Sequence, residues 1–439
     1  MISHRLVFLL VISCAAAGTV DAQGSSRLTL DEAIAQGLAA SHQLAELGAR
    51  QDGAAAAAQG SHASRLPQVS AQAGYMRTNH VDAFGLQLPG QPFRVLYPDV
   101  PDNYRTRLDF QWPIYTFGRV DALERAARAE ADASGLDRAA ARNDLKLEIT
   151  RAFWAVVTAE EAVRVVDESV RHMDASLEDM RNRFKVGLVP PNDVLSVEAQ
   201  RSRQQMLLIQ ARSVREQAVV DLRRLIGAAP DSPLEVAAVL DSPAGTFAEV
   251  DALTDEARKA RPDRQAIETR IKAAEDRREA AVADRRPTLA AGAGANLANP
   301  NPLIFPRAGV WHGSWDASVS FAWTFWDGGR VAAEVAQASA NQRAAHEGLA
   351  DFDTSLEAEV RERRLDLESA RAAVGAADDS VRAATEARRV VDERFAAGVA
   401  TATDILDAQV ALLQAGLDRT QALASVHLAE ARLTRALGR

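Results

Sequence analysis

The sequence predicts a mainly α-helical protein that also contains membrane β-strands, arranged as two copies of one structural plan. Three observations predict this class: an internal repeat, two long Ala-rich segments without proline, and short runs in which apolar and polar residues alternate. Hydrophobic residues make up 47% of the 439 residues, but aromatic residues only 5%. This composition suits long helices packed through small side chains rather than aromatic-rich globular cores.

The composition also excludes several functional classes. A formal net charge of −9 argues against nucleic acid as a partner, because phosphate binding needs clustered Lys and Arg. The single cysteine, Cys14, can form neither a disulfide scaffold nor a zinc cluster. The eight histidines are scattered, and the sequence lacks a His-Glu-x-x-His motif, a nucleophile elbow and a phosphate loop. We therefore expect no enzyme activity, no cofactor and no metal site.

Residues 1–22 have the features of a signal peptide. Arg5 supplies a positive charge, an apolar run follows at 6–13, and small residues lead to a cleavage site after Ala22. The alternative is that Val11-Ile12-Ser13-Cys14 acts as a lipobox, which would leave a lipidated Cys14 at the mature N-terminus. Both interpretations predict export. No later segment holds the ~20 consecutive apolar residues of a transmembrane helix.

An internal repeat divides the chain into two halves. The segment Arg183-Phe-Lys-Val-Gly-Leu188 returns as Arg394-Phe-Ala-Ala-Gly-Val399, a shift of 211 residues, whereas Pro67 corresponds to Pro287 at a shift of 220. The first half is therefore longer by nine residues between Pro67 and Gly118, and we expect this extra length in a loop. The resulting divisions are a first repeat at 23–227, a linker at 228–250 and a second repeat at 251–439.

Each repeat should contain a very long helix followed by a return helix. At 1.5 Å per residue, each long helix would extend about 100 Å. The predicted helices are short ones at about 29–62 and 252–285, long ones at 119–186 and 330–397, and return helices at 193–226 and 404–437. Apolar residues recur three and four apart along them, interrupted in the second long helix by Arg388, which predicts coiled-coil packing. A soluble rod-like coiled coil would explain these helices taken alone.

Four runs of about ten residues have the length and period of transmembrane β-strands. The predicted strands are about 67–78, 104–116, 288–298 and 314–326. Aromatic residues concentrate in and beside them, and we expect those at the membrane surface to form girdles: Phe110, Trp112, Tyr115, Trp315, Trp323, Phe325 and Trp326. The alternative, a strand in a soluble sandwich, would not lead directly into so long a helix.

Four strands per chain are too few for a closed barrel, and open strand edges are not tolerated in lipid. The chain must therefore oligomerise. Two copies would give eight strands with a filled interior, and three would give twelve strands, wide enough for a pore.

This arrangement resembles the TolC-like outer-membrane efflux proteins over essentially the whole mature chain. The most specific matches are the segments that begin at Arg183 and Arg394 and continue through Asp193-Val-Leu195 and Asp404-Ile-Leu-Asp407. The resemblance implies a homotrimer in the outer membrane of a Gram-negative bacterium, in contact with its lipid, with a twelve-stranded barrel and a twelve-helix periplasmic tunnel. It implies an exit duct for a tripartite efflux or type I secretion system, joined by a periplasmic adaptor to an inner-membrane transporter.

The resemblance also implies roles for residues at the two hairpin tips. The adaptor would dock on the turns, made of Val186, Gly187, Leu188, Ala397, Gly398 and Val399. Asp404 and Asp407 would form a cation-attracting ring at the periplasmic entrance, six carboxylates in a trimer. Asp193 corresponds to Asp404 in the first repeat, but Ser196 stands where the second repeat has Asp407. Ala400 replaces an Arg that locks the entrance in some relatives, so closure must differ here.

Helix capping alone also explains the residue types at these turns, with no role in a gate. Gly187 and Gly398 stand where a helix ends, which favours the left-handed conformation. Asn192 and Thr403 suit the N-cap position, which would place the following Asp in the first turn of each return helix. At the level of function, the alternative is a periplasmic coiled-coil adaptor. Paired strands and a duplicated chain argue against it, and the sequence does not reveal the cargo.

Overall fold

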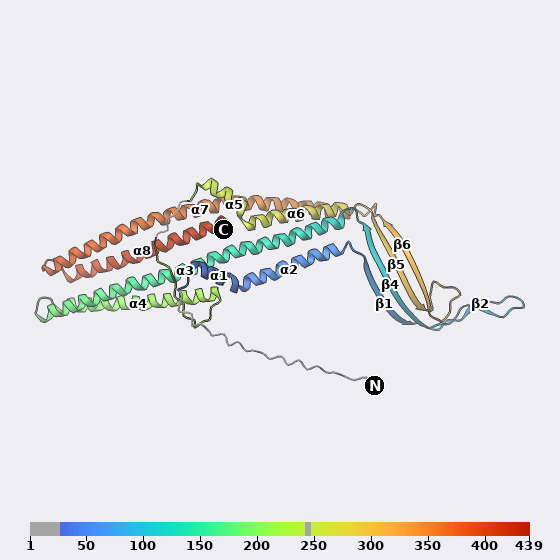
Figure 1. Cartoon of the computed structure of the whole chain (residues 1–439), viewed down its shortest axis with the longest axis horizontal. Coiled ribbons are helices and arrows are strands. Elements are labelled where there is room, and N and C mark those ends of the chain that lie inside the picture. Colours follow the sequence, from blue (N-terminus) through green and yellow to red (C-terminus); the bar gives the residue numbers. More distant parts are fainter. Residues whose placement is uncertain (1–26, 242–246) are drawn as a thin grey trace, which may run out of the picture.

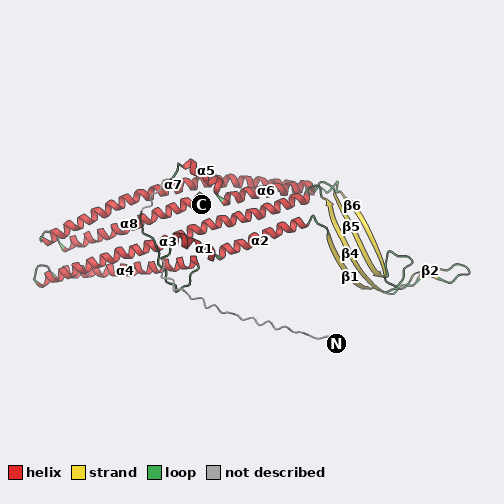
Figure 2. Ribbon diagram, in the orientation of Figure 1, coloured by secondary structure: helices red, strands yellow, loops and turns green. Residues whose placement is uncertain are grey.

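A computed structural model describes residues 27–241 and 247–439. The predicted signal peptide and Cys14 lie outside the described residues. The molecule is elongated: a long helical bundle leads at one end into a sheet, and a small hairpin extends beyond that sheet (Figures 1 and 2). The mainly α class with paired strands in two repeats is confirmed.

The two repeats have matching elements. The first repeat comprises α1 (Leu30–Ala40), α2 (His42–Ala63), β1 (Gln68–Arg77), β4 (Asp102–Tyr115), α3 (Arg119–Lys185) and α4 (Pro191–Ile226). The second comprises α5 (Val250–Ala260), α6 (Pro262–Ala283), β5 (Thr288–Asn299), β6 (His312–Ala322), α7 (Arg330–Ala396) and α8 (Ala402–Ala436). The long helices α3 and α7 are both 67 residues long. Their starts differ by 211 residues, and those of α1 and α5 by 220, as the sequence offsets predict.

Several predicted boundaries were wrong. The helices expected at 29–62 and 252–285 are each two helices, broken at the equivalent residues Ser41 and Arg261, whose backbones are extended. Ser41 Oγ accepts a hydrogen bond from the amide of Leu44 at 3.2 Å and so starts α2. Arg261 precedes Pro262, and a residue before proline is disfavoured in helical conformation.

The extra length of the first repeat lies in a loop, as expected, but this loop is not irregular. It contains a small antiparallel hairpin, β2 (Phe84–Leu86) with β3 (Arg94–Tyr97), which the sequence analysis missed. Strand β6 ends at Ala322, not near 326, so Trp323, Phe325 and Trp326 follow the strand instead of belonging to it. The return helices α4 and α8 each begin two residues before the predicted starts at 193 and 404.

The main sheet is antiparallel with the strand order β1-β4-β5-β6, so β1 and β6 are its edges. The register of the strands places apolar residues opposite one another on one face of the sheet and polar residues on the other. Leu108 of β4 lies opposite Ala295, which in turn lies opposite Trp315, so one face is apolar, and Trp315 is 79% exposed on it. The other face carries polar groups. On this face Arg107 pairs with Asp316 across β5, with Nη1 and Oδ1 3.0 Å apart, a contact called here the polar-face ion pair.

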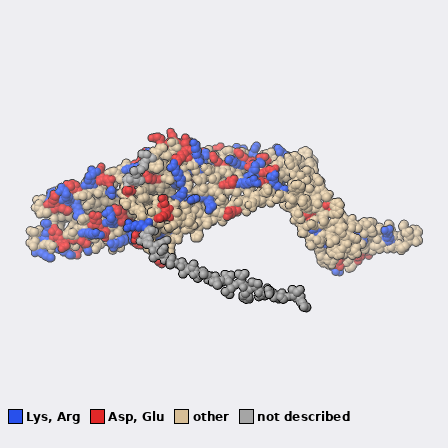
Figure 3. Space-filling view, viewed as in Figure 1, with Lys and Arg blue, Asp and Glu red and all other residues tan. Residues whose placement is uncertain are grey.

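Helix packing follows the predicted seams. Val166, Val170, Met173 and Leu177 of α3, which recur three and four residues apart, are buried, and separate apolar clusters succeed one another along the bundle. Charged residues crowd the surface of the helices, whereas the strand end is mostly uncharged (Figure 3). Within the described residues, no helix combines the length and apolar character needed to cross a membrane.

One half-buried contact ties the connecting segment to the bundle. The ring of His427 on α8 stacks on Trp154 of α3, with centroids 3.6 Å apart, and His427 Nε2 lies 2.8 Å from the carbonyl oxygen of Asp241. Burial lowers the pKa of His427, although Asp241 and Glu430 act in the opposite direction.

Candidate functional site: the hairpin tips and the membrane end

The turns that join α3 to α4 and α7 to α8 have the same structure. Gly187 and Gly398 adopt φ values of +75° and +76°, which confirms the predicted left-handed conformation. Each helix ends in a Schellman motif: the amide of Leu188 donates to the carbonyl of Arg183, and that of Val399 to Arg394, both at 2.9 Å. The side chains beside the glycines point outward, since Val186, Leu188 and Val399 are 70%, 72% and 63% exposed.

The start of α8 is capped by a residue other than the one predicted. Thr401, not Thr403, is the N-cap, and it forms a capping box with Asp404. Asp404 Oδ2 accepts from the amide and the hydroxyl of Thr401 at 2.7 and 2.8 Å. These hydrogen bonds hold the pKa of Asp404 below its usual value. Asp407 is also exposed, one turn further along the same helix.

The start of α4 differs from that of α8. Its N-cap is Pro190, not Asn192, and Pro191 occupies the first helical position. The side-chain amide of Asn192 instead donates to Asp193 Oδ1 at 3.0 Å. Asp193 lies in the first turn of α4, as predicted.

An apolar cluster joins the two hairpins just above their turns. This tip cluster consists of Met173, Leu177, Met180, Val197, Phe395, Ala402 and Ile405. Four helices contribute to it: α3, α4, α7 and α8. The guanidinium carbon of Arg183 lies 4.7 Å from the centre of the Phe395 ring, and Ala400 packs against the cluster. Ala400 is therefore part of an apolar contact between the hairpins.

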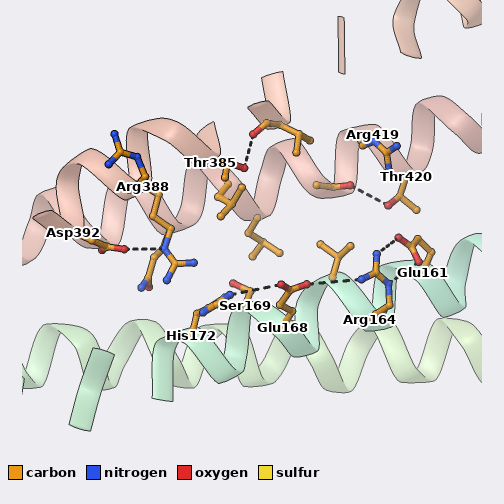
Figure 4. A pocket seen from close by; sticks show the side chains of 17 residues that line it. Glu161, Arg164, Glu168, Ser169, His172, Thr385, Arg388, Asp392, Arg419 and Thr420 are labelled. Atoms are coloured by element: carbon orange, nitrogen blue, oxygen red, sulfur yellow. Dashed lines mark hydrogen bonds and ion pairs between the residues drawn. The ribbon is translucent and has the colours of Figure 1, made fainter. Parts of the chain in front are cut away.

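Above the tip cluster, α3, α7 and α8 enclose a cavity of about 510 Å³ (Figure 4). Arg388, which interrupts the predicted seam, lines this cavity and pairs with Asp392, with Nε and Oδ2 3.5 Å apart. Gln409 is 4% exposed, and its Nε2 donates to Ser176 Oγ at 2.8 Å, which links α8 to α3. The sequence analysis noted the break at Arg388 but did not predict the cavity.

At the opposite end of the helices, one hydrogen bond is repeated. Trp112 Nε1 donates to the carbonyl of Arg65, and Trp323 Nε1 donates to that of Arg285, both at 3.2 Å. Each bond joins a strand end to the segment that follows α2 or α6. Of the expected girdle residues, Trp112, Tyr115, Trp323, Phe325 and Trp326 gather at this end, whereas Phe110 and Trp315 lie further along the strands.

Within residues 27–241 and 247–439, no group of three or more His, Cys, Asp or Glu side chains is arranged to hold a metal ion. The structure joins an amphipathic sheet, apolar on one face, to long paired helices. Strands of this length and alternation are typical of the outer-membrane class of β-proteins. A family model described as outer membrane efflux protein matches residues 33–228 and 253–439. The chain therefore belongs to the outer membrane efflux protein family.

Known structures share the fold of this chain. The outer membrane protein VceC from Vibrio cholerae has a TM-score of 0.77 at 19% identity, over 93% of this chain and 96% of its own. The open-state structure of the MtrE outer membrane channel from Neisseria gonorrhoeae has a TM-score of 0.76 at 22% identity, over 93% and 88%. Protein CyaE from Bordetella pertussis is 26% identical over 126 residues, but these cover only 29% of this chain and 27% of CyaE.

Membership of this family places the chain in the outer membrane, with a large periplasmic part. The family is one of passive outer membrane channels, not of enzymes. The alternative of a periplasmic adaptor is thereby set aside.

Proposed function

We propose that the chain is the exit duct of a tripartite efflux or type I secretion system, and that it works as a homotrimer. The observation that carries this proposal is the sheet: four strands with an apolar outer face and two unpaired edges, β1 and β6. In lipid these edges require partners, because no water is present to satisfy the backbone groups. Three chains supply twelve strands, enough for a barrel with an open lumen.

The assembly is tested by measuring the mass of the detergent-purified protein and its distribution between cell fractions. We expect three chains per particle, recovered with the outer membrane. A stable monomer in detergent would refute the trimer. Recovery with the soluble periplasmic proteins would refute the duct itself.

A periplasmic adaptor docks, in this proposal, on the hairpin turns. Support comes from three strongly exposed apolar side chains at the turns, Val186, Leu188 and Val399, held outward by matching Schellman motifs. A photo-crosslinking residue placed at Leu188 or Val399 in intact cells should capture a periplasmic protein. The matched control is Leu365, which is 59% exposed but lies in the middle of α7. Equal capture at Leu365, or none at the turns, would refute docking there.

The periplasmic constriction would be formed by Asp404 and Asp407 from each of the three chains. We infer different roles for the two residues, because the carboxylate of Asp404 already accepts hydrogen bonds from Thr401. Asp407 is thus the stronger candidate for cation attraction, and Asp404 positions the start of α8. Asp193 in the first repeat would contribute through its place in the first turn of α4. With Ala400 in place of the Arg of some relatives, the tip cluster would keep the hairpins together.

A further inference from the structure

A second cavity is lined by residues of β1, β4, β5 and the loop that follows β5. These residues belong to the end of the sheet that Figure 1 shows farthest from the helices. The volume of the cavity is about 430 Å³. Gln72, Asn103 and Arg105 line it from the polar face, and Arg307 lines it from the loop. Gly74 leaves space beside Arg105, since a Cβ added to it would meet nothing within 4 Å.

The cavity has an excess of positive charge. Three arginines line it, Arg105, Arg107 and Arg307, and none of its lining residues is acidic. Arg107 is neutralised by Asp109, whose Oδ1 lies 2.6 Å from Arg107 Nε, and by the polar-face ion pair with Asp316. Among the residues that the structure describes, no carboxylate lies within 4.0 Å of Arg105 or Arg307. The unbalanced charge therefore belongs to these two side chains.

Neutral groups hold the side chains of Arg105 and Arg307 in place. Arg105 Nε donates to Asn296 Oδ1 at 3.3 Å, and Arg307 Nη2 donates to Asn103 Oδ1 at 2.9 Å. Arg307 Nε is buried and has no hydrogen-bond partner within the described chain. A buried donor without an acceptor costs free energy, and a ligand that accepts hydrogen bonds would remove this cost.

We propose that this cavity binds small anions that bear carboxylate or phosphate groups as they pass through the lumen. The planar guanidinium group of arginine offers paired donors that match the oxygen spacing of these anions. The inference rests on the proposed function in one respect, since the polar face lines a lumen only when the sheet closes into a barrel. The duct would then attract cations at its periplasmic entrance and bind anions at its outer mouth.

The test is a calorimetric titration of the full-length chain, purified in a neutral detergent, with inorganic tripolyphosphate. The wild type should bind saturably, and Arg105→Gln with Arg307→Gln should weaken the dissociation constant at least tenfold. The matched control is Arg94→Gln, an exposed arginine on β3 at the same end of the molecule and outside the cavity, which should leave the affinity unchanged. Absence of saturable binding, or equal affinity in the double variant, would overturn the proposal.

A titration in lipid and a measurement of particle mass complete the test. Repeating the titration in nanodiscs of phosphate-bearing lipid tests whether a lipid headgroup occupies the site. Retained tripolyphosphate binding supports a lumenal site, whereas displacement by the lipid overturns it. The particle mass is measured on the same sample. If the sample is a trimer that does not bind tripolyphosphate, this inference is refuted and the proposed function stands. If the sample is a monomer whose binding depends on Arg105 and Arg307, the proposed function is refuted and the binding site stands.

Discussion

Replacing Phe395 with alanine tests whether the tip cluster holds the two hairpins together. Phe395 is 8% exposed and packs among side chains of α3, α4 and α8, with Arg183 over its ring. Truncating a buried Phe costs about 3–5 kcal/mol, and we take about 3 kcal/mol because the cluster lies close to the helix ends. This corresponds to a shift of roughly a hundredfold from packed toward separated tips.

The chain supplies its own control. Phe184 is the equivalent residue of the first repeat, 211 positions earlier, but it is 45% exposed. Phe184→Ala should therefore have a much smaller effect, although the chemical change is identical. The comparison separates loss of the cluster from loss of an aromatic side chain at a turn.

The assay is hydrogen exchange of the backbone amides around the tips, because this method reports local opening free energies. Phe395→Ala should accelerate exchange at 173–180 and 402–409 by roughly a hundredfold. Amides near the middle of α3, around Phe153, should keep their protection. Unchanged exchange at the tips, or equal acceleration in both variants, would show that the cluster does not join the hairpins.

Three other predictions address the entrance, the bundle and the sheet. Asp407→Asn should reduce cation selectivity and block by multivalent cations in planar bilayers, whereas Asp404→Asn should mainly loosen the start of α8; equal losses of selectivity would contradict this division. Because the folded pKa of His427 is lowered, its contribution to stability is full above about pH 6.5 and declines as the pH falls below that value. His427→Gln should flatten the decline in melting temperature between about pH 7.5 and 5.5, and an unchanged decline would exclude this residue as its source. Gly294→Val should disrupt the polar-face ion pair, because a Cβ there meets both partners, and lower the melting temperature of the protein. Gly74→Ala adds its methyl group in open space, so it should leave the melting temperature unchanged.

The repeat and the strand faces could be predicted because they depend on local periodicity and on offsets within the chain. Pro262 was a signal for the break between α5 and α6, and the spacing from Thr401 to Asp404 was a signal for the capping box. Both signals were present in the sequence and were missed.

Other features depend on contacts that sequence reasoning does not reveal. Phe184 and Phe395 occupy equivalent positions in the heptads, yet only Phe395 is buried, because the two hairpins pack against each other asymmetrically. Arg307 reaches Asn103, which is 204 residues away in the chain, because the loop after β5 folds back over the sheet. No periodic pattern marks such a contact.

The unpaired edges of the sheet have a consequence for how the protein reaches its membrane. β1 and β6 present 10 and 11 residues of strand edge, and each backbone group left unsatisfied in lipid costs several kcal/mol. A solitary chain therefore meets a steep barrier to insertion. Under the proposed trimeric assembly, insertion is coupled to the encounter of several chains. Biogenesis should then depend more than linearly on chain concentration, so that modest changes in expression produce large changes in the amount of finished channel.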